Sequence, residues 1–287
     1  MRPTRPGIAL LLVALAVTAV LAADTKPGLQ TTELGSGDGT IVLVHGIGGS
    51  RTDWLPTVKR LKDRYKLVMV ELPGHGASPL PEPFSLEAAA EAIHEVIAQQ
   101  NAESTIVVGQ GLGGMLALQA MARHPGHARG LVLVDASLKS PLQLDDRQID
   151  QLVRYMDENY AAFNQMAFSR MGRDSAESAI LFARMAAVRP ITVKSYMRNL
   201  LRADAGRELK KLDVPIELVL TERTWKGDAT WAEVAKTLGY RDTALVVPRR
   251  VPNAGTMVMK DQPDALAAIL AGVAEARFAG PVYTAVK

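Results

Sequence analysis

Residues 108–114, Val-Gly-Gln-Gly-Leu-Gly-Gly, have the spacing of a nucleophile elbow, the sharp strand-to-helix turn written G-x-S-x-G. An apolar run at 104–108 leads into the turn, and helix-forming residues follow it. In such a turn the serine attacks a carbonyl carbon, but here Gly111 stands at the position of the serine. Glycine has no side-chain nucleophile, so we do not expect the usual acyl-enzyme at this position.

The elements that must hold this turn alternate along the chain between short apolar runs rich in β-formers and helical stretches. Strands are expected at 40–44, 66–70, 104–108, 130–134, 215–220 and 244–247, and helices at 54–64, 85–100, 112–124, 230–238 and 262–276. This alternation predicts an α/β fold whose mostly parallel sheet is buried on both faces. Ligands of such sheets bind at the carboxyl ends of the strands.

The alternation is interrupted from residue 138 to about residue 211, where only helical patterns occur. This segment predicts an inserted helical cap, whose scattered methionines fill its core or line an apolar pocket. The expected organisation is a signal peptide at 1–22, a first core part at 23–137, the cap at 138–212 and a second core part at 213–287.

Five further stretches occur in a characteristic order: VLVHGIGG at 42–49, ELPGHGAS at 71–78, GLVLVDA at 130–136, VPIELVL at 214–220 and VPNAGTMVMKDQPDAL at 251–266. With them, residues 29–277 resemble the α/β-hydrolase superfamily, specifically its capped lipases, esterases and epoxide hydrolases. The second stretch resembles the family loop D-x-x-G-x-G-x-S, with Glu71 in place of the aspartate.

The resemblance also implies where a Ser/Asp/His triad would lie. The family's histidine follows the glycine of the last stretch, where Thr256 stands, and the acid follows the seventh strand, where Thr224 stands. With Gly111, all three catalytic positions are therefore expected to be degenerate. In a serine hydrolase, loss of the nucleophile and the base lowers turnover about a million-fold, which corresponds to an increase of roughly 8 kcal/mol in the activation free energy.

The backbone around these positions is expected to persist. The N–H groups of Ile47 and Leu112 would form the oxyanion hole, because backbone donors do not depend on the replaced side chains. The expected ligand-binding residues are His45, Gly46, Ile47, Gln110, Gly111 and Leu112. A carboxylate, carbonyl or phosphate oxygen would bind there. The alternative is that these glycine-rich turns only permit close packing.

Other polar residues near the strand ends have no visible partner in the sequence. Asp135 follows the strand after the elbow helix, where some family members keep an alternative acid; without a histidine to orient, it would cap a loop. Asp228 is a displaced acid candidate with the same weakness. Ser50 and Ser137 carry hydroxyls near the expected site.

The five histidines, His45, His75, His94, His124 and His127, all precede the last strands, so none is expected to act as the base. No His/Asp/Glu group has ligand-like spacing along the chain. We therefore expect no metal and no cofactor.

The N-terminus has Arg2 and Arg5, an apolar run at 8–21 and Val20-x-Ala22. This pattern predicts a secretory signal peptide cleaved near Ala22, with an uncleaved membrane anchor as the alternative, and a periplasmic or secreted protein. Its removal lowers the formal charge from +3 to +1, which does not indicate a nucleic-acid partner. The chain has no cysteine and so no disulfide framework.

Together these features lead us to expect an exported pseudo-hydrolase that binds a small acyl- or carboxylate-containing ligand without hydrolysing it. Three alternatives stay open: an active ester, lactone or amide hydrolase with relocated catalytic groups, a lyase or isomerase that uses only the oxyanion hole, and a protein-interaction module that works through the cap.

Overall fold

A computed structural model describes residues 28–241 and 244–279. The predicted signal peptide lies outside these residues and stays a prediction. Within the described ranges, every helix is too short or too polar to cross a lipid bilayer.

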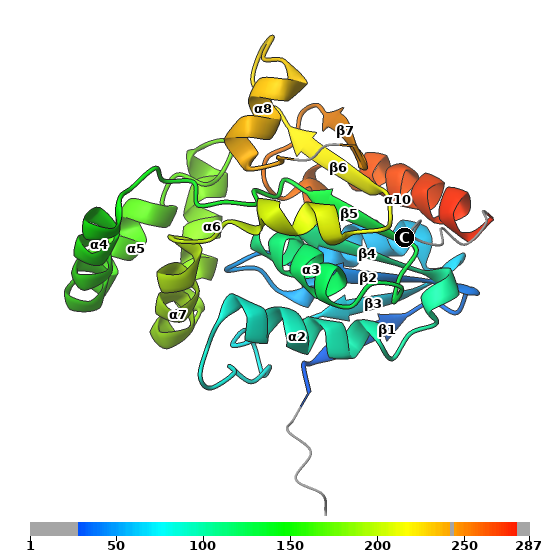
Figure 1. The fold of residues 1–287 in the computed structure, drawn as a ribbon, viewed down its shortest axis with the longest axis horizontal. Helices are drawn as coiled ribbons and strands as arrows, with labels where there is room; N and C mark the ends of the chain where they lie inside the picture. The colour runs from blue at the N-terminus through cyan, green and yellow to red at the C-terminus, as the bar shows by residue number, and fades with distance from the viewer. Residues whose placement is uncertain (1–27, 242–243, 280–287) are drawn as a thin grey trace, which may run out of the picture.

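In the described residues, seven strands form one sheet in the order β1-β3-β2-β4-β5-β6-β7 (Figure 1). Of these seven, only β1 is antiparallel to its neighbour; the other pairs are parallel, which confirms the predicted α/β class. Strands β2, β4, β5 and β6 are buried along their whole length, as expected for a sheet covered on both faces. The strands are β1 (Thr31–Leu34), β2 (Gly39–Val44), β3 (Tyr65–Val70), β4 (Thr105–Gln110), β5 (Gly130–Val134), β6 (Ile216–Thr221) and β7 (Val246–Val251).

Two layers of helices cover the sheet. Helices α2 (Leu86–Ile97) and α3 (Leu112–Arg123) pack side by side on one face, and α8 (Trp231–Leu238) and the 3-10 helix η3 (Ala205–Lys211) contribute to the same core. The opposite face is covered by α1 (Leu55–Leu61), α9 (Val258–Asp261) and α10 (Pro263–Phe278). Shorter 3-10 helices are η1 (Arg51–Trp54) and η2 (Ala102–Ser104).

Four helices follow β5 and precede β6, in the range assigned to the cap: α4 (Asp146–Glu158), α5 (Tyr160–Phe168), α6 (Ser175–Ala187) and α7 (Pro190–Leu200). They gather beyond one end of the sheet (left in Figure 1) around their own small core, which includes Met156 and Phe163. Helix α7 joins this group to the loop after β3, because Tyr196 Oη donates a hydrogen bond to Pro73 O at 3.1 Å. Residues of α6 and α7 also border a cavity with residues at the carboxyl ends of β4 and β5. The assignment of 138–212 as a cap stays a prediction.

Candidate active site

The predicted elbow is the turn between β4 and α3. Gly111 caps the N-terminus of α3 with φ 54° and ψ −122°, a conformation that L side chains rarely adopt. Its N–H donates to Val134 O at 2.9 Å, which ties the turn to β5. A Cβ built on Gly111 would have no atom within 4 Å. The position therefore faces open space, wide enough for a small side chain or a water molecule.

That space belongs to a cavity of about 200 Å³ enclosed by the elbow, the loop after β2 and the cap helices α6 and α7. Five of the predicted ligand-binding residues line it: Gly46, Ile47, Gln110, Gly111 and Leu112. Half of the fourteen other lining residues are apolar: Met115, Pro141, Met171, Leu181, Met185, Leu200 and Met257. Lys139 and Arg184 are among the polar ones. The cavity therefore suits a small, largely aliphatic group held against a polar floor.

The loop after β2 holds the predicted oxyanion donor between two anchored neighbours. The Gly46 N–H donates to Gln110 Oε1 at 2.8 Å, and the Gly48 N–H donates to His75 Nε2 at 3.2 Å. Among the described residues, the N–H groups of Ile47 and Leu112 have no acceptor, and both residues line the cavity. Two free backbone donors, one of them at the start of α3, favour a developing negative charge on an oxygen.

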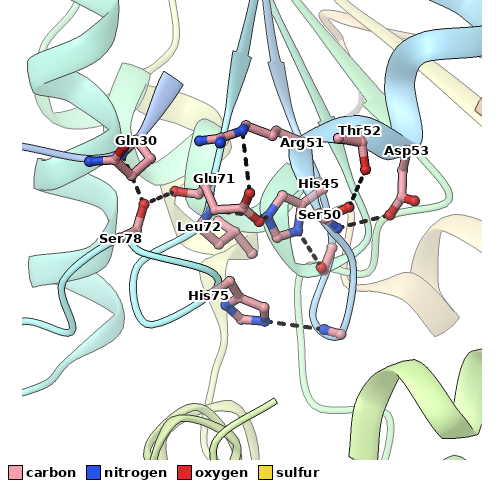
Figure 2. A network of polar contacts seen from close by, with 12 residues as sticks. Gln30, His45, Ser50, Arg51, Thr52, Asp53, Glu71, Leu72, His75 and Ser78 are labelled. Atoms are coloured by element: carbon pink, nitrogen blue, oxygen red, sulfur yellow. Dashed lines mark hydrogen bonds and ion pairs between the residues drawn. The ribbon is translucent and has the colours of Figure 1, made fainter. Parts of the chain in front are cut away.

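His45, expected among the ligand-binding residues, does not line the cavity. Figure 2 shows its ring beside Glu71 and Leu72. Its ring is 1% exposed. Nδ1 is 2.8 Å from Gly46 O, and Nε2 is 3.0 Å from both the Leu72 nitrogen and Glu71 Oε1. The side chain therefore joins the oxyanion loop to the loop after β3, which is a positioning role.

Two ionisable neighbours of His45 are also structural. Burial acts to raise the pKa of Glu71, but the hydrogen bond to His45 and the charge of Arg51 outweigh it, so that pKa lies below its ordinary value. Burial, with His45 close by, lowers the pKa of His75 to about 4. A neutral His75 can donate from Nδ1 to Pro73 O and still accept from Gly48 at Nε2. Both groups thus fix the loop geometry and do not face the cavity.

Two threonine hydroxyls donate to Asp135, directly after β5: Thr224 Oγ1 at 2.6 Å and Thr221 Oγ1 at 3.3 Å from Asp135 Oδ1. Thr256, the other predicted triad position, lines the same cavity. Gln110 Nε2 donates to Thr256 Oγ1 and to Thr256 O, each at 3.0 Å. Because Gln110 also accepts from Gly46, one chain of hydrogen bonds links the oxyanion loop, the elbow and the loop that holds Thr256.

Asp135 itself is the acidic group of the cavity wall. Its φ of 48° lies in the left-handed region, which costs a non-glycine residue about 1–3 kcal/mol and is concentrated at functional sites. Burial raises the pKa of Asp135, while the Thr224 hydroxyl and the charge of Arg223 counteract part of that rise. The two roles left open for Asp135, an alternative acid and a loop cap, both stay predictions.

The other candidate groups are engaged elsewhere. Ser137 lines the cavity, but its hydroxyl donates to Lys139 O at 3.0 Å and lies 3.3 Å from Leu238 O. Ser50 does not line the cavity and shares a hydrogen bond with Thr52 at 2.8 Å. Asp228 is exposed in the loop before α8 and does not line the cavity. Asp135 is therefore the carboxylate placed to act on a bound molecule.

Residues 41–269 match the model of the alpha/beta hydrolase family. The chain belongs to this family. It is 31% identical over 190 residues to a pimeloyl-[acyl-carrier protein] methyl ester esterase of Neisseria meningitidis, covering 62% of this chain and 73% of that protein. The protein of the same name from Vibrio cholerae is 32% identical over 194 residues, 63% of this chain and 74% of its own length. A solved esterase from Exiguobacterium antarcticum shares the fold, with a TM-score of 0.70 at 16% identity over 86% of this chain and 95% of its own.

These relatives are named esterases, so membership of the alpha/beta hydrolase family points to an active hydrolase. The expectation of a binding protein that does not hydrolyse its ligand is therefore wrong, and the alternative with relocated catalytic groups agrees better with the relatives. The assignment of Thr224 and Thr256 to the triad positions rests on the family pattern and stays a prediction.

Proposed function

We propose that the protein hydrolyses carboxylic esters with a small aliphatic acyl group, using a water molecule activated by Asp135. One observation carries the proposal. The half-buried Asp135 carboxylate, the open space beside Gly111 and the free N–H groups of Ile47 and Leu112 all border one cavity. Gln110 pairs with Val134 in adjacent strands, so Gly111 and Asp135 follow at neighbouring strand ends, about 5 Å apart by ordinary sheet spacing.

The proposed reaction takes place in two steps. A water oxygen in the space beside Gly111 attacks the ester carbonyl carbon while Asp135 accepts the water proton. The carbonyl oxygen becomes an oxyanion that accepts hydrogen bonds from Ile47 N–H and Leu112 N–H. When the tetrahedral intermediate collapses, the C–O bond to the alcohol breaks, and the protonated Asp135 returns its proton to the leaving oxygen. The products are the acid and the alcohol, and the carboxylate is regenerated.

The raised pKa of Asp135 suits this role, because a carboxylate with a pKa nearer neutral pH is a stronger general base. A general base contributes about 10²–10⁴-fold. Oxyanion hole and substrate binding alone give about 10³–10⁴-fold over water in triad-deleted serine proteases. The product, about 10⁵–10⁸-fold, describes a slower catalyst than an intact triad but a measurable one.

The cavity supports a small acyl group. Its volume of about 200 Å³ is below the roughly 300–1,000 Å³ of pockets for drug-sized ligands, and the apolar part of its wall is mainly methionine and leucine. The methyl ester named in the curated relatives is consistent with a small leaving alcohol. Methyl and p-nitrophenyl esters of short and medium aliphatic acids are therefore the first substrates to test.

The test compares three proteins on this ester panel: the wild type, Asp135→Asn and the control Asp228→Asn. Asparagine keeps the shape of the carboxylate and tolerates the left-handed conformation of Asp135. We expect Asp135→Asn to lower kcat by about 10²–10⁴-fold. Asp228→Asn also loses a carboxylate, but from an exposed loop outside the cavity, so it should retain full turnover.

Intact-mass spectra of acid-quenched turnover mixtures should contain no acylated protein, because water attacks the ester directly. Wild-type-like turnover by Asp135→Asn would refute the role of this carboxylate. An acyl adduct on the protein would refute direct attack by water and identify a nucleophile. A wild type that hydrolyses none of these esters above the rate in buffer would refute the proposed function.

A further inference from the structure

Three histidines and a glutamate gather at the end of α3 that lies away from the elbow. Glu91 and His94 are one turn apart on α2, His124 caps the C-terminus of α3, and His127 follows in the loop before β5. Helices α2 and α3 pack on one another, and this packing fixes the backbone positions of Glu91, His94 and His124 (Figure 1). The 12 residues of α3 separate it from Gly111 by about 18 Å at 1.5 Å per residue.

Packing brings the donor atoms of this cluster within reach of one another. His124 Nε2 lies 2.8 Å from Glu91 Oε2, and His94 Nδ1 lies 3.6 Å from Glu91 Oε1. The ligand atoms that Glu91, His94 and His124 offer all lie within 4.8 Å of one another. These separations approach those around a tetrahedral zinc ion, where each ligand is about 2.0–2.2 Å from the metal.

The second nitrogen of His94 is oriented by the fourth member of the cluster. His94 Nε2 and His127 Nδ1 are 2.6 Å apart, so one of the two nitrogens donates a proton to the other. When His94 is the donor, its Nδ1 is left with a free lone pair on the side of Glu91. A metal-bound imidazole commonly gives its other N–H to such an acceptor, which fixes both the tautomer and the ring orientation.

The chemistry of the donor set also suits a cation. Two imidazoles and a carboxylate are ligands that zinc and neighbouring divalent transition metals accept.

We propose that Glu91, His94 and His124 form a binding site for a divalent transition-metal ion such as Zn²⁺, with His127 orienting His94. Its ligands lie up to 33 residues apart in the sequence and meet only because α2 packs on α3, so their spacing along the chain does not indicate them. The proposal thereby departs from the expectation that the chain holds no metal.

Binding requires one local adjustment. The rings of His94 and His124 are stacked, with centroids 3.6 Å apart and planes at 11°. Nitrogen lone pairs lie in the ring planes, so a shared ion needs one ring to tilt. His94 is held by its neighbours with 11% of its side chain exposed, whereas His124 is 31% exposed and has room to turn. The ion would then join α2 to the C-terminus of α3.

The experiment uses the untagged chain, stripped with a chelator, because a polyhistidine tag would bind the same ions. Zinc binding is measured by calorimetry and by the shift in Tm on adding ZnCl₂. A metal that binds only the folded state at 100 times its Kd should raise Tm by about 5–10 °C for a chain of this size. His124→Gln should remove this shift. Glu87→Gln is the matched control, because Glu87 lies one turn before Glu91 on the same helix and contacts Arg123 instead.

His127→Gln separates a metal site from a cluster of hydrogen bonds, since loss of an orienting partner typically weakens metal binding by about 10–100-fold without abolishing it. One saturable zinc per chain, lost in His124→Gln, weakened in His127→Gln and retained in Glu87→Gln, is the expected result. An equal zinc response in His124→Gln, or no saturable binding by the wild type, would overturn the proposal.

Discussion

Direct attack by water makes a specific prediction for Gly111→Ser, the substitution that returns a hydroxyl to the elbow. A Cβ at this position would have no atom within 4 Å, so the serine fits without a clash. Its Oγ would occupy the space in which the proposed water attacks. Asp135 would then face the serine hydroxyl in place of the water that it activates. We therefore expect the substitution to lower ester hydrolysis, even though it restores the family motif.

Gly111→Ser should lower both the stability of the protein and its turnover of esters. A non-glycine residue at φ 54° and ψ −122° costs about 1–3 kcal/mol, which should lower Tm by about 2–10 °C in a chain of this size. Loss of general-base catalysis on the water should lower kcat by about 10²–10⁴-fold. Gly227→Ser is the matched control, because Gly227 has φ 53° and an equally open Cβ position but does not line the cavity.

The assay combines melting curves, initial rates on the most reactive ester and intact-mass spectra of quenched mixtures. Gly227→Ser should show a similar loss of Tm and wild-type turnover, which separates backbone strain from loss of the water position. If Gly111→Ser hydrolyses the ester faster than the wild type, the cavity contains a base that can activate a serine, and the assignment of water as nucleophile is refuted.

Three further predictions concern the groups around Asp135. Hydrolysis should fall as pH drops through the raised pKa of Asp135. Because the folded state binds this proton more readily than the unfolded chain, the contribution of Asp135 to the free energy of unfolding increases as pH falls. Asp135→Asn should therefore have a higher Tm than the wild type at pH 7 in calorimetric scans, and a lower Tm would contradict this sign. Thr224→Val removes the 2.6 Å hydrogen bond to Asp135, so it should lower the free energy of unfolding, measured in urea, by about 1.5–3 kcal/mol. It should also move the acidic limb of the pH–rate profile to higher pH. An unchanged limb would show that the hydroxyl does not influence the base. Gly46→Ala would place Cβ 2.3 Å from Gln110 Oε1, so the oxyanion loop must shift. We expect kcat in the ester assay to fall by about 10²–10³-fold. An unchanged kcat would show that Ile47 N–H is not a donor to the oxyanion.

The sheet could be predicted from the sequence because its central strands are continuous apolar runs, and a parallel strand buried on both faces needs no polar alternation. The runs at 104–108 and 130–134 became β4 and β5 with nearly the predicted bounds. Strand β1 is different: its sequence Thr-Thr-Glu-Leu is mostly exposed at the sheet edge, so no apolar run marks it. It is fixed by pairing with β3, which is a tertiary contact.

The backbone of the site could also be predicted, since glycine spacing indicates where chain segments must approach closely. A Cβ on Gly113 would lie 2.2 Å from His45 O, so the motif itself encodes the contact between elbow helix and oxyanion loop. The role of His45 was harder to predict. A histidine beside a glycine-rich loop can face the cavity or support it from beneath, and only its contacts with Glu71 and Leu72 decide between the two.

Asp135 was the hardest to weigh, because its hydrogen-bond partners lie 86 and 89 residues further along the chain. In sequence it is an acid without a histidine, and Thr224 is a residue without catalytic chemistry of its own. In the folded chain Thr221 and Thr224 donate hydrogen bonds to its carboxylate, while Gln110 holds Thr256 at the same cavity. The two hydroxyls orient the carboxylate without competing for the proton of a bound water. In the proposed site the carboxylate itself lies beside the water, so no imidazole is needed. Because a carboxylate is a weaker base than the imidazole of a triad, hydrolysis is expected to be slow and to decrease in acid.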